Sequence, residues 1–243
     1  QDGGFPQAGC KKVCCKNAWG EAAKRRDPAS LGIIDPISGQ RWFVECTPSF
    51  PRQARRFDAA HPKLAGRIDG ILLTHAHMGH YAGLLHLGRE VMGADGVPVH
   101  AMPRMEKFLR TQGPWSQLVQ LKNIALRPMR DGRAFVLNKR LRVTPFLVPH
   151  RDEFSETVGF RIEGPRQKIL WLPDIDKWER WKTPLEKALA GVDVAYLDAT
   201  FYADGELPGR DMSKIPHPFI AETMRRLQAV HQLDAVVVGR PSG

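Results

Sequence analysis

Thr74-His75-Ala76-His77-Met78-Gly79-His80 is the stretch that decides the fold, and it directly follows the apolar run Ile71-Leu72-Leu73. Neutral imidazole is the commonest protein ligand for zinc, and three histidines fall within this stretch. Side chains two residues apart in an extended segment point the same way, so His75 and His77 can converge on one ion. A buried strand that is followed directly by a histidine-rich turn predicts a metal site at the end of the strand. The alternative is a loop of solvated histidines.

The spacing resembles the His-x-His-x-Asp-His signature of the metallo-β-lactamase superfamily, with Gly79 in place of the aspartate. The resemblance implies the α/β class and the αββα four-layer sandwich, with the metal site along one edge between two sheets. It assigns His75 and His77 to a first metal site and His80 to a second one. Gly79 removes a carboxylate from the second site, so we expect that site to be weak or absent.

Two further ligands are expected where apolar strands end. His150 follows Leu147-Val148-Pro149, and Asp174 follows Ile169-Leu170-Trp171-Leu172-Pro173. The resemblance implies that His150 completes the first site and that Asp174 bridges two metals; Asp176 could substitute for Asp174. The superfamily also has a final histidine after its last strand, whereas residues 239–243 contain none. We therefore expect one tightly held metal at His75, His77 and His150.

Two catalytic candidates and one supporting residue follow from these assignments. Asp174 is expected to orient a metal-activated water and to accept its proton. His80 is expected to act as a second-site ligand or as a proton shuttle. Asp198 ends the apolar run 194–197 and is expected either to fix a ligand histidine by a hydrogen bond or to cap a helix or turn. Four aromatic residues are candidate pocket walls or ordinary packing residues: Tyr81, Trp178, Trp181 and Tyr202.

Cys10, Cys14 and Cys15 fall within six residues and predict a structural metal site, with a disulfide as the alternative. The segment Gly3-Gly4-Phe5-Pro6-Gln7 and the cysteines resemble the pyrroloquinoline quinone biosynthesis protein B family. That family has the metallo-β-lactamase fold, and the resemblance implies a structural zinc near the cluster. The cysteine spacing departs from the Cys-x-Cys-x-x-Cys of the family. His217 and Cys46 are both open as the fourth ligand.

The length predicts one domain or at most two small ones, and we expect a single domain over residues 1–243 that opens with a cysteine-rich loop at 1–30. Expected strands lie at 31–34, 41–46, 68–74, 97–102, 118–120, 124–126, 134–137, 141–148, 157–162, 168–172, 192–197 and 235–238. Expected helices lie at 51–60, 81–92, 103–110, 184–189 and 218–230. The chain starts where the superfamily normally has a first strand under way, so it is either abbreviated or incomplete.

Composition limits the partners. Lys and Arg exceed Asp and Glu by 36 to 26, for a net charge of +10, but the basic residues are scattered and form no arm. A small-molecule substrate is therefore expected ahead of nucleic acid. No apolar stretch reaches the roughly 20 residues of a membrane span, so we expect a soluble protein with no membrane partner. The cysteines favour a cytoplasmic location slightly, because a metal-bound cluster suits a reducing compartment.

Three functions remain open. The first is a zinc-dependent hydrolase that acts on an ester, lactone, β-lactam or phosphodiester. The second is an iron-dependent oxygenase or accessory protein of quinone-cofactor biosynthesis, because two or three histidines with a carboxylate also suit non-haem iron. The third is a non-catalytic binding protein with a decayed metal site.

Overall fold

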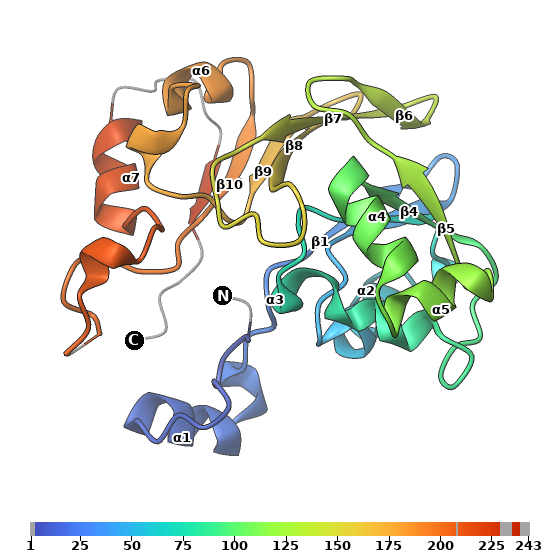
Figure 1. The fold of residues 1–243 in the computed structure, drawn as a ribbon, viewed down its shortest axis with the longest axis horizontal. Coiled ribbons are helices and arrows are strands. Elements are labelled where there is room, and N and C mark those ends of the chain that lie inside the picture. The colour runs from blue at the N-terminus through green and yellow to red at the C-terminus, as the bar shows by residue number, and fades with distance from the viewer. Residues whose placement is uncertain (1–2, 208, 229–234, 239–243) are drawn as a thin grey trace. The chain divides into compact units, whose positions relative to one another are not determined.

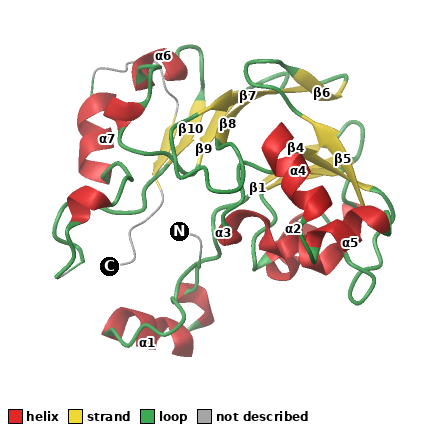
Figure 2. Ribbon diagram, in the orientation of Figure 1, coloured by secondary structure: helices red, strands yellow, loops and turns green. Residues whose placement is uncertain are grey.

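The computed structural model describes residues 3–207, 209–228 and 235–238, and the chain forms two compact units. Unit 1 contains residues up to 129 together with Glu153–Glu156, and unit 2 contains Arg130–Asp152 and the residues from Thr157 onward. Each unit has one sheet with helices (Figures 1 and 2). The mixed α/β class is as expected, while the single domain over 1–243 stays a prediction.

Unit 1 is built on a five-stranded sheet in the order β1-β2-β3-β4-β5. Only β1 and β2 pair in antiparallel fashion; β2 to β5 are parallel neighbours. The strands are β1 (Leu31–Asp35), β2 (Gln40–Val44), β3 (Gly70–Leu72), β4 (Val97–Ala101) and β5 (Ile124–Pro128). Parallel strands end at the same sheet edge, so the residues that follow β2 and β3 lie close together.

The helices of unit 1 correct three expectations. They are α1 (Val13–Gly20), α2 (Phe50–Ala60), α3 (Met78–Tyr81), α4 (Pro103–Thr111) and α5 (Trp115–Gln120), with short 3₁₀ turns η1 (Ala22–Lys24), η2 (Pro62–Leu64) and η3 (Ala82–Leu87). Residues 1–30 are not all loop, because α1 lies among them. The strand expected at 118–120 is wrong, since those residues end α5. The helix expected at 81–92 is instead one α-helical turn followed by η3.

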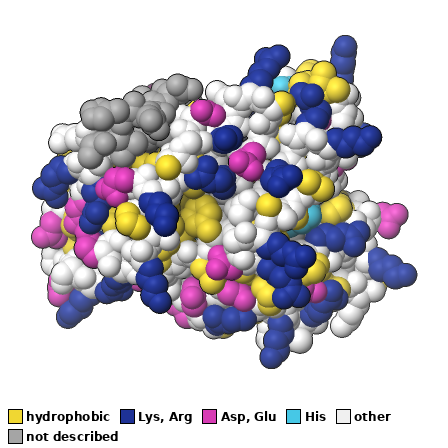
Figure 3. All heavy atoms as spheres, turned by 90° about the horizontal axis from the view of Figure 1, so that it is seen from above, with side chains coloured by type: hydrophobic (Ala, Val, Ile, Leu, Met, Phe, Trp, Pro, Cys, Tyr) yellow, Lys and Arg dark blue, Asp and Glu magenta, His cyan; other side chains and the backbone are white. Residues whose placement is uncertain are grey.

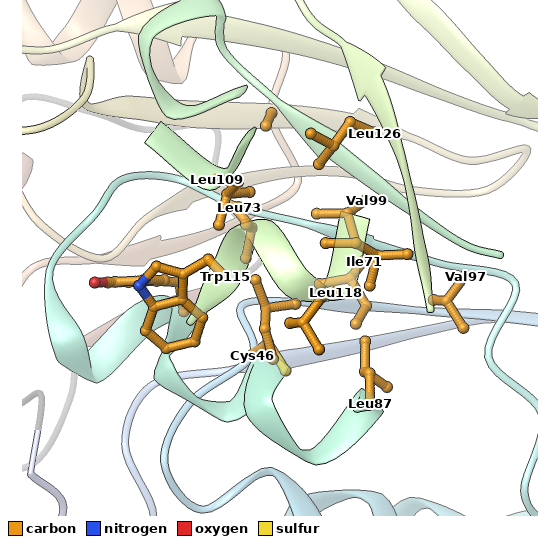
Figure 4. Close-up of a cluster of buried hydrophobic side chains, with 14 of the residues drawn as sticks. Cys46, Ile71, Leu73, Leu87, Val97, Val99, Leu109, Trp115, Leu118 and Leu126 are labelled. Atoms are coloured by element: carbon orange, nitrogen blue, oxygen red, sulfur yellow. The ribbon is translucent and has the colours of Figure 1, made fainter. Parts of the chain in front are cut away.

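One hydrophobic core holds the sheet and helices of unit 1 together. Ile71 of β3 and Val99 of β4 are fully buried and meet Leu109 of α4 and Leu118 of α5 in this core (Figure 4). Trp115 and Leu118 are one helical turn apart, and both are buried. That helical spacing explains why a strand was the wrong reading of 118–120.

Unit 2 has a six-stranded sheet in the order β11-β10-β9-β8-β7-β6. The strands are β6 (Phe135–Asn138), β7 (Leu141–Leu147), β8 (Val158–Glu163), β9 (Lys168–Leu172), β10 (Val194–Leu197) and β11 (Ala235–Val238). β6 to β9 form an antiparallel meander, whereas β9, β10 and β11 run parallel. The parallel pair β9 and β10 brings the residues after Leu172 and Leu197 to one sheet edge.

Short helices cover one face of the unit 2 sheet. They are η4 (Trp178–Arg180), α6 (Leu185–Leu189), η5 (Met212–Lys214) and α7 (Ile220–Leu227). Leu170 and Ala195 of the sheet pack with Trp178, Leu185 and Leu189. The helix expected at 218–230 is α7, although residues 229 and 230 lie outside the described part of the chain.

The face shown in Figure 3 carries many Lys and Arg side chains, with Asp and Glu side chains among them. Among the described helices, none combines the length and the apolar character needed to cross a bilayer.

Candidate metal centre

In unit 1, the candidate site forms where β2 and β3 end. Val44 pairs with Leu72, so Glu45 lies beside the start of the histidine loop, residues 73–80. Glu45 donates its backbone N–H to Leu72, and Leu73 donates to the carbonyl of His100. These bonds continue the ladder past the strands and fix the beginning of the loop. The end of the buried strand thus holds the start of the histidine loop in a fixed position.

Glu45 is a buried carboxylate in an unusual backbone conformation. Its residue is fully buried and its φ is +70°, in the left-handed region that non-glycine residues rarely adopt. The carboxylate accepts a hydrogen bond of 2.5 Å from Thr74 Oγ1 and lies 3.3 Å from His80 Nδ1. The sequence analysis missed Glu45, although an acid directly after a buried strand is the same signal that singled out Asp174.

The hydrogen bonds assign the tautomer of His75. Thr74 Oγ1 has one hydrogen, which it donates to Glu45, so at 2.9 Å from His75 Nδ1 it acts as an acceptor. His75 therefore carries its hydrogen on Nδ1 and presents a lone pair on Nε2. Burial of His75, which is 1% exposed, keeps this arrangement away from competing water.

His75 Nε2 lies 2.9 Å from His77 Nδ1, and the centroids of the two rings are 4.4 Å apart. The other ring nitrogen of His77, Nε2, lies 3.0 Å from Oε2 of Glu153, which also belongs to unit 1. A carboxylate only accepts, so the hydrogen of His77 lies on Nε2 and the lone pair on Nδ1. Two lone pairs at this distance repel each other unless a cation lies against both. The donor set of unit 1 thus fits a metal ion.

His80 lies beside the same pair. The centroid of its ring is 4.2 Å from that of the His75 ring, and its backbone N–H donates a hydrogen bond to the carbonyl of His77. Gly79, where the superfamily signature has an acid, is buried between them. The structure therefore brings His75, His77 and His80 together in one loop.

In unit 2, Asp174 and Asp198 follow the parallel strands β9 and β10. Ligand atoms of Asp174, Asp198 and His217 all lie within 4.8 Å of one another, which is a spacing that suits a shared metal ion. Asp198 is 1% exposed, and its carboxylate accepts hydrogen bonds from the backbone N–H of Ile175 and from the N–H and hydroxyl of Thr200.

His217 donates Nδ1–H to Asp198 Oδ2 at 2.6 Å, and its Nδ1 lies 3.8 Å from Asp174 Oδ1. A hydrogen on Nδ1 leaves the Nε2 of His217 as the nitrogen with a lone pair. Sequence reasoning offered His217 as a ligand of the cysteine cluster and missed this position. The superfamily resemblance predicts a histidine after the last strand, 235–238, whereas His217 lies well before it; residues 239–243 lie outside the described part of the chain.

His150 is also oriented by a carboxylate within unit 2. Its Nδ1 lies 3.3 Å from Asp176 Oδ1, and its Nε2 lies 3.9 Å from Asp174 Oδ2. Asp176 is itself held by Arg180 and by the bond from its own N–H to the carbonyl of Pro149. Asp176 therefore supports His150, in addition to being the alternative to Asp174 that the sequence suggested.

The four cysteines form no disulfide. A hydrogen bond from the Cys15 thiol, with help from a backbone N–H at Lys12, lowers the pKa of Cys10, while that same bond raises the pKa of Cys15. Within the described residues, no group of three metal-ligand side chains contains a cysteine. The structural metal at Cys10, Cys14 and Cys15 stays a prediction.

Cys46 does not suit a metal ligand. It is fully buried among apolar side chains of the unit 1 core (Figure 4). Burial, together with the charge of Glu45, raises its pKa well above the usual thiol value. Metal ligation requires the thiolate, so this environment disfavours it.

The candidate wall residues pack in different ways. Tyr81 is buried against Trp115, and Trp178 is buried and donates Nε1–H to Thr223. Trp181 stacks on Phe146, whereas Tyr202 is 56% exposed. Tyr81 and Trp178 thus act as core residues of their units.

The sequence profile of a family described as "Beta-lactamase superfamily domain" matches residues 40–238. Among curated proteins, "Coenzyme PQQ synthesis protein B" of Xanthomonas campestris is 29% identical over 230 residues, covering 84% of this chain and 72% of that protein.

Solved structures show the same fold. Zn(2+)-bound PqqB of Methylobacterium extorquens matches with a TM-score of 0.80 at 19% identity, over 99% of this chain and 86% of that one. A diphosphatase of the PhnP family matches with a TM-score of 0.67 at 20% identity, over 95% and 78% of the two chains. These matches establish the fold expected from the histidine motif.

Proposed function

This chain belongs to the β-lactamase superfamily, and from that premise we propose that it is a metal-dependent hydrolase. One observation carries the proposal: four histidines each have one ring nitrogen held by a hydrogen-bond acceptor. The pairs are His75 with Thr74, His77 with Glu153, His150 with Asp176 and His217 with Asp198. Metal-ligating histidines almost always donate their second ring N–H in this way, since the contact fixes the tautomer and orients the ring.

The proposed ligands of the main site are His75 and His77 of unit 1 with His150 and Asp174 of unit 2. The sequence resemblance supplies this set, and the orientation of each donor within its own unit supports it. His80 and His217 are the proposed ligands of a weaker second position. Gly79 leaves that position without the usual carboxylate.

A zinc ion bound there would lower the pKa of a water molecule from 15.7 to about 7 and polarise a carbonyl or phosphoryl oxygen. Asp174, which lies 3.9 Å from His150 Nε2 and 3.8 Å from His217 Nδ1, is the group that would orient this water and accept its proton. His217, whose Nδ1 is tied to Asp198, keeps Nε2 for passing a proton onward. His80, next to Glu45, has the same capacity in unit 1.

We propose a small-molecule ester, lactone, β-lactam or phosphodiester as the substrate. Nucleic acid is a weaker candidate, because the basic residues are scattered along the sequence and form no arm. A structural metal at Cys10, Cys14 and Cys15 is part of the proposal, because the three thiols fall within six residues and form no disulfide.

A second candidate function is supported by the relatives named for coenzyme PQQ synthesis. In that case the site would hold iron and take part in quinone-cofactor formation, since histidines with a carboxylate suit non-haem iron as well as zinc. A non-catalytic binding protein is the third candidate, and retention of so many oriented histidines argues against it.

The deciding experiment is elemental analysis of protein purified without added metal, beside His77→Ala and a His61→Ala control. The proposal expects zinc in the parent protein, about one equivalent less in His77→Ala, and no change in the control. Hydrolysis of an ester, lactone, β-lactam or phosphodiester should then depend on His77. Iron in the histidine site would favour the quinone-cofactor role. Unchanged metal content in His77→Ala would overturn the proposed metal centre.

A further inference from the structure

Four residues from the middle of the chain, Glu153–Glu156, belong to unit 1, although the residues on both sides of them belong to unit 2. We call this segment the clasp. Ser155 Oγ accepts a hydrogen bond of 2.8 Å from the backbone N–H of Ala76, in the middle of the histidine loop. The clasp thus contacts the loop at its backbone as well as at His77.

Two more contacts anchor the clasp to α4. Both carboxylate oxygens of Glu156 accept from the backbone N–H of Arg104, at 3.1 and 3.0 Å, where α4 begins. The ring of Phe154 lies 5.5 Å from that of Phe108. A carboxylate at a helix start meets N–H groups that have no partner within the helix. The clasp is therefore fixed on unit 1 through its last three residues.

Glu153 places its carboxylate beside the His77 ring. Its Oε2 lies 3.0 Å from His77 Nε2, and its side chain is 46% exposed. An isolated ion-pair-like contact at that exposure contributes little, because both side chains lose freedom and water competes. Here the neighbouring residues Phe154, Ser155 and Glu156 already hold the backbone in place, so the contact requires little further ordering.

We propose that Glu153 is a positioning residue of the metal centre, which holds the hydrogen of His77 on Nε2 and so aims the lone pair of Nδ1 at the metal. This inference rests on the proposed function. Neutral imidazole divides its hydrogen between two tautomers, and only one of them lets Nδ1 bind a cation. A carboxylate on Nε2–H selects that tautomer, keeps the ring orientation and raises the basicity of Nδ1.

The inference is tested on the full-length protein with zinc as the probe, by competition against a chelator. Glu153→Ala should lower the zinc affinity of the histidine site by about 10- to 100-fold, the usual effect of losing such a partner. Glu153→Gln should lose less, because its amide oxygen still accepts a hydrogen bond. Glu156→Gln is the matched control: it alters the same clasp without touching a histidine, and it should bind zinc like the parent protein.

A second readout is independent of affinity. Long-range ¹H–¹⁵N spectra report which ring nitrogen carries the hydrogen, and the signal of His77 is identified by its loss in His77→Ala. The metal-free parent protein should show His77 with its hydrogen on Nε2. In Glu153→Ala the population should move toward Nδ1–H, while Glu156→Gln should match the parent.

The outcomes separate the two proposals. Loss of zinc in His77→Ala combined with parent-like affinity and tautomer in Glu153→Ala would overturn the role of Glu153 and leave the metal centre standing. Equal losses in Glu153→Ala and Glu156→Gln would also overturn it, since they would mean that the clasp acts only as a structural support. Unchanged zinc in His77→Ala would overturn the proposed function itself.

Discussion

Thr74 sits between two buried groups that both depend on its hydroxyl. It donates to Glu45 at 2.5 Å and accepts from His75 at 2.9 Å. Glu45 keeps a strained backbone with φ of +70° in this place, and strain of that kind is retained where surrounding contacts over-determine it. A single methyl-for-hydroxyl exchange therefore disturbs a carboxylate and an imidazole together.

We predict that Thr74→Val lowers the free energy of unfolding by about 1–3 kcal/mol, the cost of leaving buried polar groups without a partner. Thr74→Ser keeps the hydroxyl and serves as the control, with a smaller loss. Urea unfolding monitored by circular dichroism measures both. Equal stability of Thr74→Val and the parent would show that the hydroxyl does not bridge the two groups.

His100 of β4 predicts a pH dependence of stability. Burial, together with the positive charge of Arg127, lowers the pKa of His100 to about 4. In the folded state His100 binds a proton only near pH 4, whereas in the unfolded state it binds one near pH 6.5. The free energy of unfolding is therefore highest above pH 6.5 and decreases as the pH falls toward 4. The contribution of His100 to this loss is about 2 kcal/mol between pH 7 and pH 5.

His100→Gln should therefore lose about 2 kcal/mol less stability than the parent over that pH range. Urea unfolding at pH 7, 6 and 5 measures the difference. The same dependence on pH in both proteins would show that His100 does not titrate as its burial implies.

The sequence could single out candidate site residues where a strand end marked them. His75, His77, His150 and Asp174 all follow apolar runs, and that placement drew attention to them. Glu153 contacts His77 and Asp176 contacts His150, and both histidines are distant in the sequence. These contacts exist only in the folded chain. Periodicity carries no information on such pairs.

At the scale of elements, η3 holds the histidine loop against the core of unit 1. Gly83 donates its N–H to the carbonyl of Cys46, and an added Cβ would lie 2.0 Å from the carbonyl oxygen of Thr47 and 2.8 Å from Phe50 Cβ. Cys46 in turn donates to the carbonyl of His80. The close approach of two backbones explains why a glycine stands here.

We predict that Gly83→Ala lowers the free energy of unfolding by about 3 kcal/mol or more, since backbone must move to admit the methyl group. Gly20→Ala is the control, because a Cβ at Gly20 meets nothing within 4 Å and its φ is not positive. Thermal and urea unfolding compare the two variants. Parent-like stability of Gly83→Ala would mean that η3 can shift freely.

Most strands could be predicted because they are apolar runs bounded by turn residues, as in β3 and β10. The exceptions are short. Residues 118–120 are too few to show a period, and only the partner position at Trp115 reveals the helix. The predicted helix 81–92 is wrong because the α-helix ends at Tyr81, the chain continues as η3 to Leu87, and Gly88 has an extended backbone.

At the scale of the molecule, the proposed ligands come from both units, and this predicts a shared response to metal. Zinc at 100 times its dissociation constant should stabilise the native state by about 2.7 kcal/mol. Hydrogen exchange should slow in residues 72–80 of unit 1 and in residues 170–176 of unit 2 together. Measurement by mass spectrometry with and without zinc tests this.

His77→Ala should abolish the protection in both segments, whereas His61→Ala should keep it. Protection confined to residues 72–80 would show that His150 and Asp174 are not ligands of the same metal ion. The fold class itself was predictable from the histidine motif, but the contribution of His217 was not, because that histidine is identified only by its contacts with Asp174 and Asp198.

The clasp also has a consequence for how the protein is made. A ribosome releases the histidine loop early, and the segment Glu153–Glu156 leaves much later. Until then, the N–H groups of Ala76 and His77 that the clasp will bind must be satisfied by water. Unit 1 thus cannot finish folding until residue 156 has left the ribosome. For the same reason, the residues of unit 1 are not contiguous in the sequence, and any segment that contains all of them also contains Arg130–Asp152 of unit 2.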